Sequence, residues 1–245
     1  LFGKYASSVH RKWEEKGFSP LAQSTTADKN IFRERAFRLL GLPTEAWYVV
    51  VHAREAGYHR SWHKHHPGTR NAKIDTYLKA IEYITDKGGW VIRAGDGSME
   101  PIPKMRQTID YATSQFHLES LDIGICENCE FFIGTNSGFS IIPGVFGIKG
   151  VLTNWSPIGI PNWYPNDIMV PKKVWDANLK RYQTAREMFD CFSAWSQFEN
   201  DYKYSHLSLH DNTDLDILNA TREMYALHFD DESAFKATKK ESHLQ

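Results

Sequence analysis

Residues suited to binding an anion follow the strand-like apolar segments of this sequence. Arg54 comes directly after the run WYVVVHA, and Asp96 comes after WVIRAG. A third apolar run, residues 131–133, ends at the turn Gly-Thr-Asn-Ser-Gly of residues 134–138. Arginine can hold a phosphate through two hydrogen bonds, and a turn that enters a helix presents backbone N–H groups without partners. These residues therefore predict a local site for a phosphate or another anion.

The turn at residues 134–138 has two interpretations. In the first, Thr135, Asn136 and Ser137 supply short polar side chains to a phosphate, while Gly134 and Gly138 let it approach the backbone. In the second, Asn136 or Ser137 caps the following helix and no ligand binds. The turn lacks the Gly-Lys-Ser/Thr of a Walker A loop and the spacing of a GxGxxG dinucleotide fingerprint. Nucleotide hydrolysis and nicotinamide chemistry therefore lose support.

Asp96 and the aromatic residues of the later loop each have two interpretations. Asp96 either accepts a hydrogen bond from a ribose or a base, or forms an Asx turn within GDGS. His52 is the one histidine of its strand, and such a residue is typical of a protein core. Trp155, Trp163 and Tyr164 form either a stacking surface for a sugar or base, or a well-packed loop.

The loop that follows Arg54 contains four histidines, which are His59, His63, His65 and His66. Their spacing matches no common zinc pattern, and no nearby DxD arrangement would hold a divalent cation on a diphosphate. We therefore expect no metal site. Loop polarity, or contacts with sugar and phosphate, explains the histidines better.

The composition excludes several classes of function. The chain of 245 residues has a formal net charge of -1, which provides no broad basic surface for nucleic acid or an anionic membrane. No apolar run is long enough to span a bilayer, and the N-terminus lacks the order of a secretory signal. Three cysteines leave one unpaired in any disulfide scheme, which suits a reducing cytosol. Cys126 and Cys129 are expected to be packed thiols, because a zinc site needs a second pair.

From residue 46 onward, strand-like and helix-like segments alternate. The predicted strands cover residues 47–53, 90–96, 130–136 and 149–155, with an edge strand at 166–171. The predicted helices cover residues 30–41, 74–89 and 213–229, part of 120–129, and part of 137–147 with Pro143 in the first turn. This alternation predicts an α/β fold with a parallel sheet of right-handed βαβ units. Ligands of such sheets bind beyond the carboxyl ends of the strands, where the residues above gather.

The order of these motifs resembles a known family. A strand ending in His-x-Arg, a strand ending in Gly-Asp, and a strand followed by Gly-Thr-x-Ser-Gly are similar to the donor-binding half of GT-B glycosyltransferases, notably the fucosyltransferase-related group. The segments YVVVHAREAGYHRSWHKHHPGTRNA, IGTNSGFSIIPGVFG and VLTNWSPIGIPNWYP look still more like a family of bacterial glycosyltransferases linked to surface-polysaccharide biosynthesis. That resemblance covers residues 46–230.

The resemblance implies a Rossmann-like domain at residues 46–230 that binds a nucleotide-diphosphate sugar. It also implies that residues 1–45 are a helical segment left from an acceptor domain, and residues 231–245 a polar tail. Arg54 would neutralise the donor diphosphate beside His52, Asp96 would contact the nucleoside, and residues 135–138 would cradle phosphate. Such enzymes are commonly metal-independent and inverting, and use no cofactor besides the donor. GDP is the carrier in the fucosyltransferase group, but that motif usually has two arginines where Arg54 is followed here by Glu55.

An inverting transfer also needs a general base for the acceptor hydroxyl. Glu55 and His59 are the local candidates, and with Arg54 they form the implied catalytic set. The implied acceptor is a glycan or a lipid-linked glycan, and the implied location is the cytoplasm, including the periphery of the inner membrane. A non-catalytic nucleotide- or glycan-binding module with the same fold is the main alternative. An α/β hydrolase would need GxSxG, which TNSGF lacks.

Overall fold

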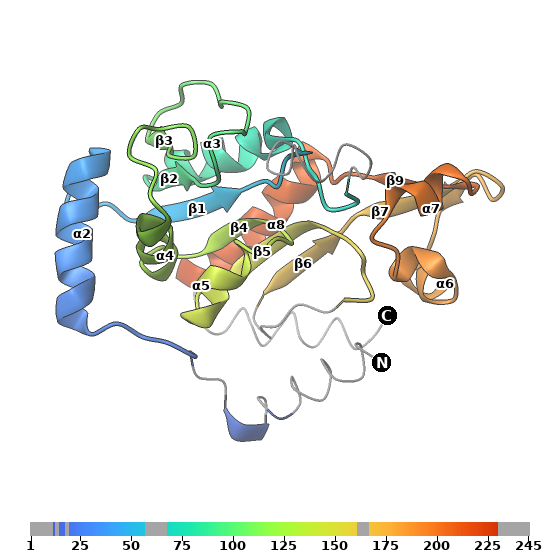
Figure 1. Cartoon of the computed structure of the whole chain (residues 1–245), viewed down its shortest axis with the longest axis horizontal. Helices are drawn as coiled ribbons and strands as arrows, with labels where there is room; N and C mark the ends of the chain where they lie inside the picture. Colours follow the sequence, from blue (N-terminus) through green and yellow to red (C-terminus); the bar gives the residue numbers. More distant parts are fainter. Residues whose placement is uncertain (1–11, 13–14, 18–19, 57–67, 161–166, 230–245) are drawn as a thin grey trace.

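The centre of the molecule is a six-stranded parallel sheet in the order β3-β2-β1-β4-β5-β6. A computed structural model describes residues 12, 15–17, 20–56, 68–160 and 167–229 of the chain (Figure 1). The strands are β1 (Tyr48–His52), β2 (Trp90–Arg93), β3 (Thr108–Asp110), β4 (Phe132–Thr135), β5 (Gly150–Trp155) and β6 (Ile168–Pro171). Their order reverses between β1 and β4, as in a Rossmann fold. The predicted α/β class is confirmed, and so is the edge strand predicted at residues 166–171.

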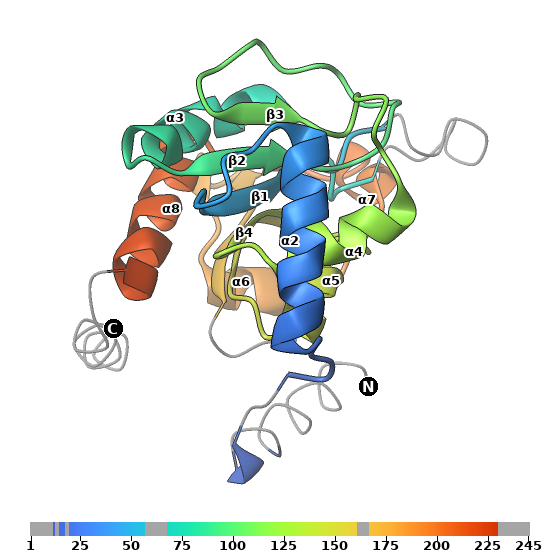
Figure 2. The same ribbon diagram turned by 90° about the vertical axis from the view of Figure 1, so that its left-hand side faces the viewer.

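Helices cover both faces of the sheet (Figure 2). One face carries η2 (Ile74–Tyr77), α3 (Leu78–Asp86) and α8 (Asp214–Phe229), and the other carries α4 (Glu119–Glu127) and α5 (Ile141–Val145). A separate buried hydrophobic cluster fills each interface, so the domain is a three-layer sandwich. None of the helices in the described part of the chain has the length and apolar character needed to cross a membrane.

Burial on both faces explains the apolar run YVVV of strand β1. All five of its residues are buried, because helices cover the sheet on both sides. Tyr48 and Val50 belong to the hydrophobic cluster on the α4 face, whereas Val49 and Val51 belong to the cluster on the α3 face. Side chains alternate along a strand, so a central strand needs apolar residues at odd and even positions alike.

Helix α2 (Thr26–Leu40) stands at the amino-terminal ends of the strands (Figure 1). Gly41 ends it in the left-handed conformation, as its position in the sequence predicted. The ring of Phe37 packs edge-on against Tyr48, with ring centroids 5.7 Å apart, and so fixes the helix on the core. At α8, the hydroxyl of Thr213 accepts a hydrogen bond from the backbone amide of Asp216, so Thr213 is its N-cap.

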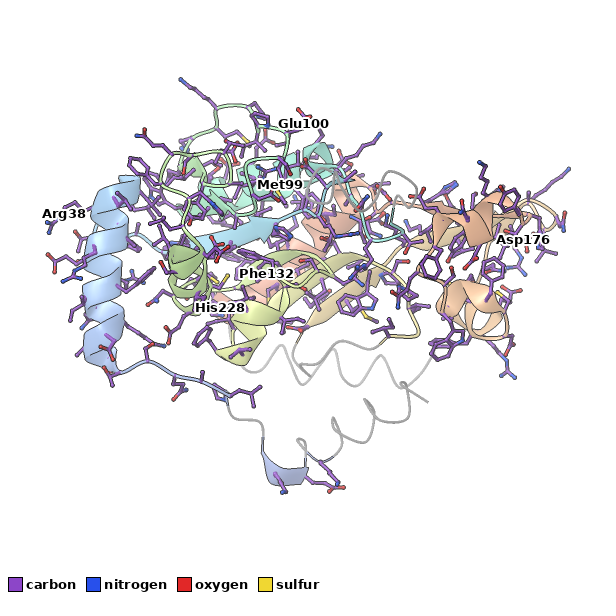
Figure 3. All side chains as sticks on the ribbon, in the orientation of Figure 1. Arg38, Met99, Glu100, Phe132, Asp176 and His228 are labelled. Atoms are coloured by element: carbon purple, nitrogen blue, oxygen red, sulfur yellow. The ribbon has the colours of Figure 1, made fainter. Side chains whose placement is uncertain are left out.

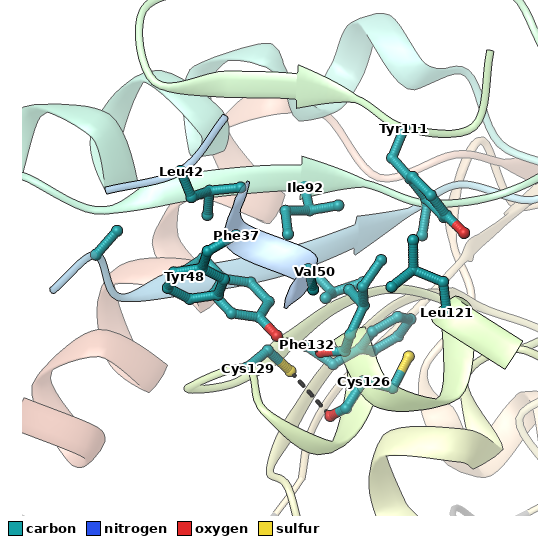
Figure 4. Packing of buried hydrophobic residues seen from close by; sticks show 14 of the residues in the cluster. Phe37, Leu42, Tyr48, Val50, Ile92, Tyr111, Leu121, Cys126, Cys129 and Phe132 are labelled. Atoms are coloured by element: carbon teal, nitrogen blue, oxygen red, sulfur yellow. Dashed lines mark hydrogen bonds between the residues drawn. The ribbon is translucent and has the colours of Figure 1, made fainter. Parts of the chain in front are cut away.

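The CxxC thiols are packed into the core at the end of α4, Cys126 within the helix and Cys129 just after it (Figure 4). Cys126 and Cys129 are both buried and form no disulfide, and the thiol of Cys129 donates a hydrogen bond to the carbonyl of Cys126. Burial raises the pKa of each thiol, so both are protonated. The prediction of a packed pair of thiols is confirmed.

The segment between β6 and α8 forms a second, smaller sheet that the sequence did not predict. Its antiparallel strands are β7 (Lys173–Asp176), β8 (Arg181–Tyr182) and β9 (Leu207–His210), in the order β8-β7-β9. Helices α6 (Ala185–Phe189) and α7 (Glu199–Lys203) and the turn η3 (Phe192–Ala194) complete it. This subdomain projects beyond the carboxyl ends of the main strands (Figure 1). Its two ends are joined, because the side-chain amide of Asn212 donates to the carbonyl of Pro171 across 2.9 Å.

Candidate functional site

A cavity of about 420 Å³ opens where the strand order reverses, at the carboxyl ends of β1 and β4. In open α/β sheets this point places two loops on opposite faces and so leaves a crevice between them. The cavity brings together six residues that the sequence singled out, which are His52, Arg54, Glu55, Asp96, Ser137 and Gly138. It also contains Arg70, His117 and Asp122, which the sequence did not indicate. We call it the switch-point cavity.

Hydrogen bonds from the backbone amide and from the side chain hold Arg54 at this cavity. Its backbone amide donates to Oγ1 of Thr135 at 2.9 Å, and its guanidinium donates to Oδ1 of Asn71 at 2.9 Å. The guanidinium also lies against the backbone of Gly68, where an added Cβ would come within 2.8 Å of Nη1. Arg54 is therefore fixed in position while part of its guanidinium faces the cavity.

Arg70 adds a second positive charge to the cavity lining, beside Arg54. Burial lowers the pKa of Arg54, and the positive charge of Arg70 lowers it further. Within the described residues, neither arginine forms an ion pair with a carboxylate. Two neighbouring guanidinium groups that lack a carboxylate partner form a site that an anion would stabilise.

Glu55 sits on the wall of the cavity with both carboxylate oxygens already engaged. Oε1 accepts from the fully buried guanidinium of Arg93 at 3.1 Å, and Oε2 accepts from the backbone amide of Glu100 at 2.8 Å. Arg93 also binds Asp110 at 3.1 Å, so it balances two carboxylates. Figure 3 labels Glu100 on the loop after β2, which this network ties to the end of β1. In this arrangement Glu55 has a structural contact at each oxygen.

The turn after β4 is held by hydrogen bonds of its own, but neither Asn136 nor Ser137 caps α5, whose N-cap is Ser140 without a side-chain cap hydrogen bond. Ser137 and Ser140 exchange hydrogen bonds, each backbone amide donating to the hydroxyl of the other residue, and α5 begins after them at Ile141. Pro143 lies in its first turn, as predicted. Gly138 faces open space, because a Cβ added there would meet no atom within 4 Å. The turn therefore leaves room for a ligand at Gly138, which is the point of close approach.

Thr135 and Asn136 are buried at the start of this turn rather than turned into the switch-point cavity. Thr135 is fully buried, and its hydroxyl is the acceptor for Arg54. The amide of Asn136 donates to the carbonyl of Ser156 at 2.7 Å. Its Oδ1 is buried without a hydrogen-bond partner among the described residues. These two residues position the turn, and Asn136 lines a neighbouring cavity of about 330 Å³.

Asp96 and His52 occupy the wall next to Arg54. Oδ1 of Asp96 accepts from the backbone amide of Ser98 at 2.8 Å, so the Asx turn is present, while its Oδ2 is buried and unpartnered within the described chain. His52 is buried, its ring stacks on Phe139 with centroids 4.8 Å apart, and Nδ1 lies 3.2 Å from the carbonyl of Ala94. Burial lowers the pKa of His52 to about 4, so its ring is neutral at pH 7.

Helix α4 contributes an acidic group, Asp122, to the lining of the cavity. Oδ2 of Asp122 lies 3.6 Å from Nε2 of His117, and the ring of His117 packs on Tyr111. Burial raises the pKa of the Asp122 carboxyl, and Tyr111 and His117 oppose that shift. The sequence gave no sign of this pair, because the short strand β3 that precedes it was not recognised. The cavity thus holds both cationic and anionic groups.

For three aromatic residues the sequence left open a stacking surface for a sugar or base and a well-packed loop. Trp155 is only 6% exposed, belongs to the main hydrophobic cluster and donates through Nε1 to the carbonyl of Ile160 at 2.7 Å. It still lines the 330 Å³ cavity, but as part of the packed wall. Trp163 and Tyr164, like the candidate base His59, lie outside the described residues.

Comparison with known proteins gives structural neighbours and no sequence match. No protein-family model and no curated sequence matches the chain. One neighbour is the glycosyl transferase family 9 protein from Veillonella parvula, at a TM-score of 0.38 and 11% identity, over 72% of this chain and 49% of that one. Another is the dodecameric iron-containing heptosyltransferase TibC, solved with ADP-D-beta-D-heptose, at a TM-score of 0.38 and 15% identity, over 80% of this chain and 56% of that one. Both neighbours are glycosyltransferases, and the chain spans about half the length of each.

Proposed function

We propose that this chain is the donor-binding part of a glycosyltransferase that uses a nucleotide-diphosphate sugar. The observation that carries the proposal is the pair Arg54 and Arg70, two arginines without a carboxylate partner among the described residues, at the switch point of a Rossmann-order sheet. The diphosphate lies between these arginines and Gly138, while Asp96 and Asp122 accept hydrogen bonds from the nucleoside or sugar. Both ends of a sugar nucleotide then meet groups of suited chemistry.

The reaction we propose is a single displacement at the anomeric carbon. A hydroxyl of the acceptor glycan attacks that carbon, the bond from the carbon to the diphosphate oxygen breaks, and the hydroxyl proton passes to a general base. Negative charge grows on the leaving diphosphate, and Arg54 and Arg70 stabilise it there. The transfer inverts the anomeric centre and needs no metal, since the two guanidinium groups neutralise the charge that a divalent cation would otherwise carry. The nucleotide base we propose is guanine, uracil, adenine or cytosine. GDP is the carrier that the motif resemblance implies.

A non-catalytic binding module is the second candidate, and one observation favours it. Both oxygens of Glu55, a candidate base, are already bound by Arg93 and by the backbone of Glu100. A base must accept a proton from the acceptor, so Glu55 would first have to leave one of these partners. Under this proposal the chain binds the nucleotide sugar at the same cavity without transferring the sugar.

Titration calorimetry with GDP, UDP, ADP and CMP, each with and without EDTA, tests the shared part of both candidates. We expect one nucleoside diphosphate to bind, EDTA to leave its affinity unchanged, and Arg54→Ala to weaken it about tenfold to a hundredfold. Affinity for the matching nucleoside should change little in that variant. Arg38→Ala, on the exposed side of α2 (Figure 3), is the matched control and should bind like the unaltered protein.

Several outcomes would contradict the proposal. If none of the four nucleotides binds, the chain has no donor site. If EDTA abolishes binding, the site depends on a metal. If Arg54→Ala binds as well as Arg38→Ala does, the diphosphate does not lie at Arg54. Binding without release or transfer of the sugar from the corresponding nucleotide sugar would favour the module.

A further inference from the structure

A second and larger cavity of about 1040 Å³ lies between the main sheet and the small subdomain. Its walls come from the loop before η2, from the junction of β6 and β7, and from α7 and β9. The polar residues that matter for its chemistry are Thr69, Asn71, Lys172, Glu199, Ser208 and Asp211. Glu55 lines both this groove and the switch-point cavity, so both spaces border that residue. We call the larger cavity the subdomain groove.

A buried lysine forms the fixed point of the subdomain groove. Lys172 is 6% exposed, and its ammonium donates to the carbonyl of Asn71 at 2.6 Å and lies 2.7 Å from Oδ1 of Asp211. Asp211 is about one-third exposed and lines the groove, so its carboxylate is open to a ligand. Glu199 lies close enough for the charges of Lys172 and Asp211 to act on it, and burial raises its pKa. A buried ammonium between carboxylates is held rigidly, which suits a binding site better than a freely moving surface lysine.

The hydroxyl of Thr69 is an independent sign that the groove takes a ligand. Thr69 is 1% exposed and lines the groove, and its Oγ1 has no hydrogen-bond partner among the described residues. A buried hydroxyl without a partner is costly, so native proteins rarely leave one unless a ligand or water completes it. The groove therefore contains a polar atom that the described chain leaves unsatisfied.

The size and charge of the groove narrow the class of ligand. Its volume lies at the upper end of the range of about 300–1,000 Å³ usual for small-molecule sites, so it has room for more than one ring. Lys172 is balanced by Asp211, and Glu55 by Arg93, and the other charged lining residues carry both signs, so no single charge dominates the groove; they are Lys73, Lys203, Asp75, Glu100 and Glu199. A strongly charged ligand gains little there. A hydroxyl group both donates and accepts, and can therefore serve Asp211, Thr69 and Ser208 alike.

We propose that the subdomain groove binds the acceptor glycan of the reaction, as a chain of at least two sugar rings whose reacting end lies at Glu55. This inference rests on the proposed function, because it takes the switch-point cavity as the donor site. The hydroxyls of the glycan bind Asp211, Thr69 and Ser208, which line the groove. The acceptor hydroxyl meets the donor at Glu55, which both cavities border.

An array of immobilised oligosaccharides, probed with labelled protein in the absence of nucleotide, tests the groove by itself. We expect the unaltered protein to retain a subset of glycans of two or more rings. Asp211→Asn should lower that retention about tenfold or more, because one charge-assisted hydrogen bond is lost. Ser208→Phe, which fills the groove from an exposed position of β9, should lower it without disturbing Lys172. Asp190→Asn, on the exposed surface of α6, is the matched control and should bind normally.

Failure of this inference is distinguishable from failure of the proposed function. Retention of no glycan by the unaltered protein, or equal retention by Ser208→Phe, would overturn the groove assignment even if calorimetry shows nucleotide binding. Retention of peptides along the edge strand β9 in place of glycans would overturn it as well. Glycan retention that Asp211→Asn and Ser208→Phe both lose supports the groove, whatever the nucleotide titration shows. Nucleotide affinity should stay unchanged in both variants.

Discussion

The backbone amide of Arg54 donates a hydrogen bond across 2.9 Å to the hydroxyl of Thr135, and this bond joins the ends of the two central strands. Thr135 is fully buried, so water cannot replace it as the acceptor. The bond therefore sets where Arg54 leaves the sheet, and with it the direction in which the guanidinium points. A residue outside the cavity controls the position of the group that we assign to the diphosphate.

Thr135→Val tests that control, because valine keeps the shape of threonine and removes the hydroxyl. We expect the free energy of unfolding to fall by about 1–3 kcal/mol, since the amide of Arg54 loses its partner in a buried place. Nucleoside diphosphate affinity should fall too. Thr221→Val is the control, because the hydroxyl of Thr221 bonds only the carbonyl of Ile217 within its own helix. Equal denaturant midpoints for the two variants would contradict the role of Thr135.

Glu55→Gln tests the network around the buried guanidinium of Arg93. We expect the free energy of unfolding to fall by about 2–3 kcal/mol, less than for an isolated buried ion pair because Asp110 still balances Arg93. Glu34→Gln removes an equivalent charge from an exposed pair on α2 and should change stability little. Urea denaturation of both variants measures the difference. If transfer activity is also lost while nucleotide binding remains, Glu55 acts in the chemistry as well as in the fold.

The pKa of His52 predicts how stability depends on pH. Burial lowers this pKa from 6.5 to about 4, so the folded protein does not bind the proton that the unfolded chain takes up between those values. Above pH 6.5 the ring is neutral in both states and the effect vanishes. As the pH falls from 6.5 to 4, the His52 contribution should lower the free energy of unfolding by about 3 kcal/mol.

Comparison with His52→Gln isolates this contribution, because glutamine does not titrate. Urea denaturation at several pH values should show a steeper loss of stability in the unaltered protein than in the variant. Parallel curves for the two proteins would mean that His52 is accessible to protons in the folded state. The stack of its ring on Phe139 is lost in the variant, so the comparison uses slopes rather than absolute stabilities.

An added methyl group should affect stability at one glycine of the turn after β4 and ligand binding at another. At Gly134 a Cβ would lie 2.3 Å from the carbonyl oxygen of His52, so Gly134→Ala should destabilise the fold by about 1–3 kcal/mol or more. At Gly138 a Cβ would meet nothing within 4 Å, so Gly138→Ala should keep the stability. It should weaken nucleoside diphosphate binding, because the methyl group occupies the place of close approach. Thermal melting and calorimetry distinguish the two effects.

The parallel sheet could be predicted because its central strands are buried on both faces. The runs that became β1 and β4 are continuously apolar, and Gly41 and Thr213 mark helix ends by local chemistry alone. The small sheet lacks such signals. Strand β7 alternates exposed and buried residues, and β8 is two residues long and exposed, so charged residues interrupt every apolar pattern there.

The candidate site could be predicted only where it follows a recognisable strand. Arg54 and Asp96 were found because they come directly after apolar runs, and the structure places both in one cavity. Arg70 lies in a polar loop far from any strand end, and only the folded path of the chain brings it beside Arg54. His117 and Asp122 follow the three-residue strand β3, which is too short for its pattern to stand out. The buried positions of Thr135 and Trp155 likewise depend on neighbours that the sequence does not name.

Asn212 bonds the carbonyl of Pro171, so the chain leaves the main sheet and returns to it at nearly the same place. Asn154 of β5 strengthens this closure by exchanging backbone-to-side-chain hydrogen bonds with Asn212. Residues 172–211 therefore form a cassette whose two ends lie together. Its bridge from Phe198 to Gly68 and its bond from Lys172 to Asn71 reach loops of the main domain, so an exchange of this cassette would leave the register of the six parallel strands untouched. If the proposed sites hold, a change in this cassette alters recognition of the acceptor glycan, while the strand ends that hold the nucleotide sugar stay the same.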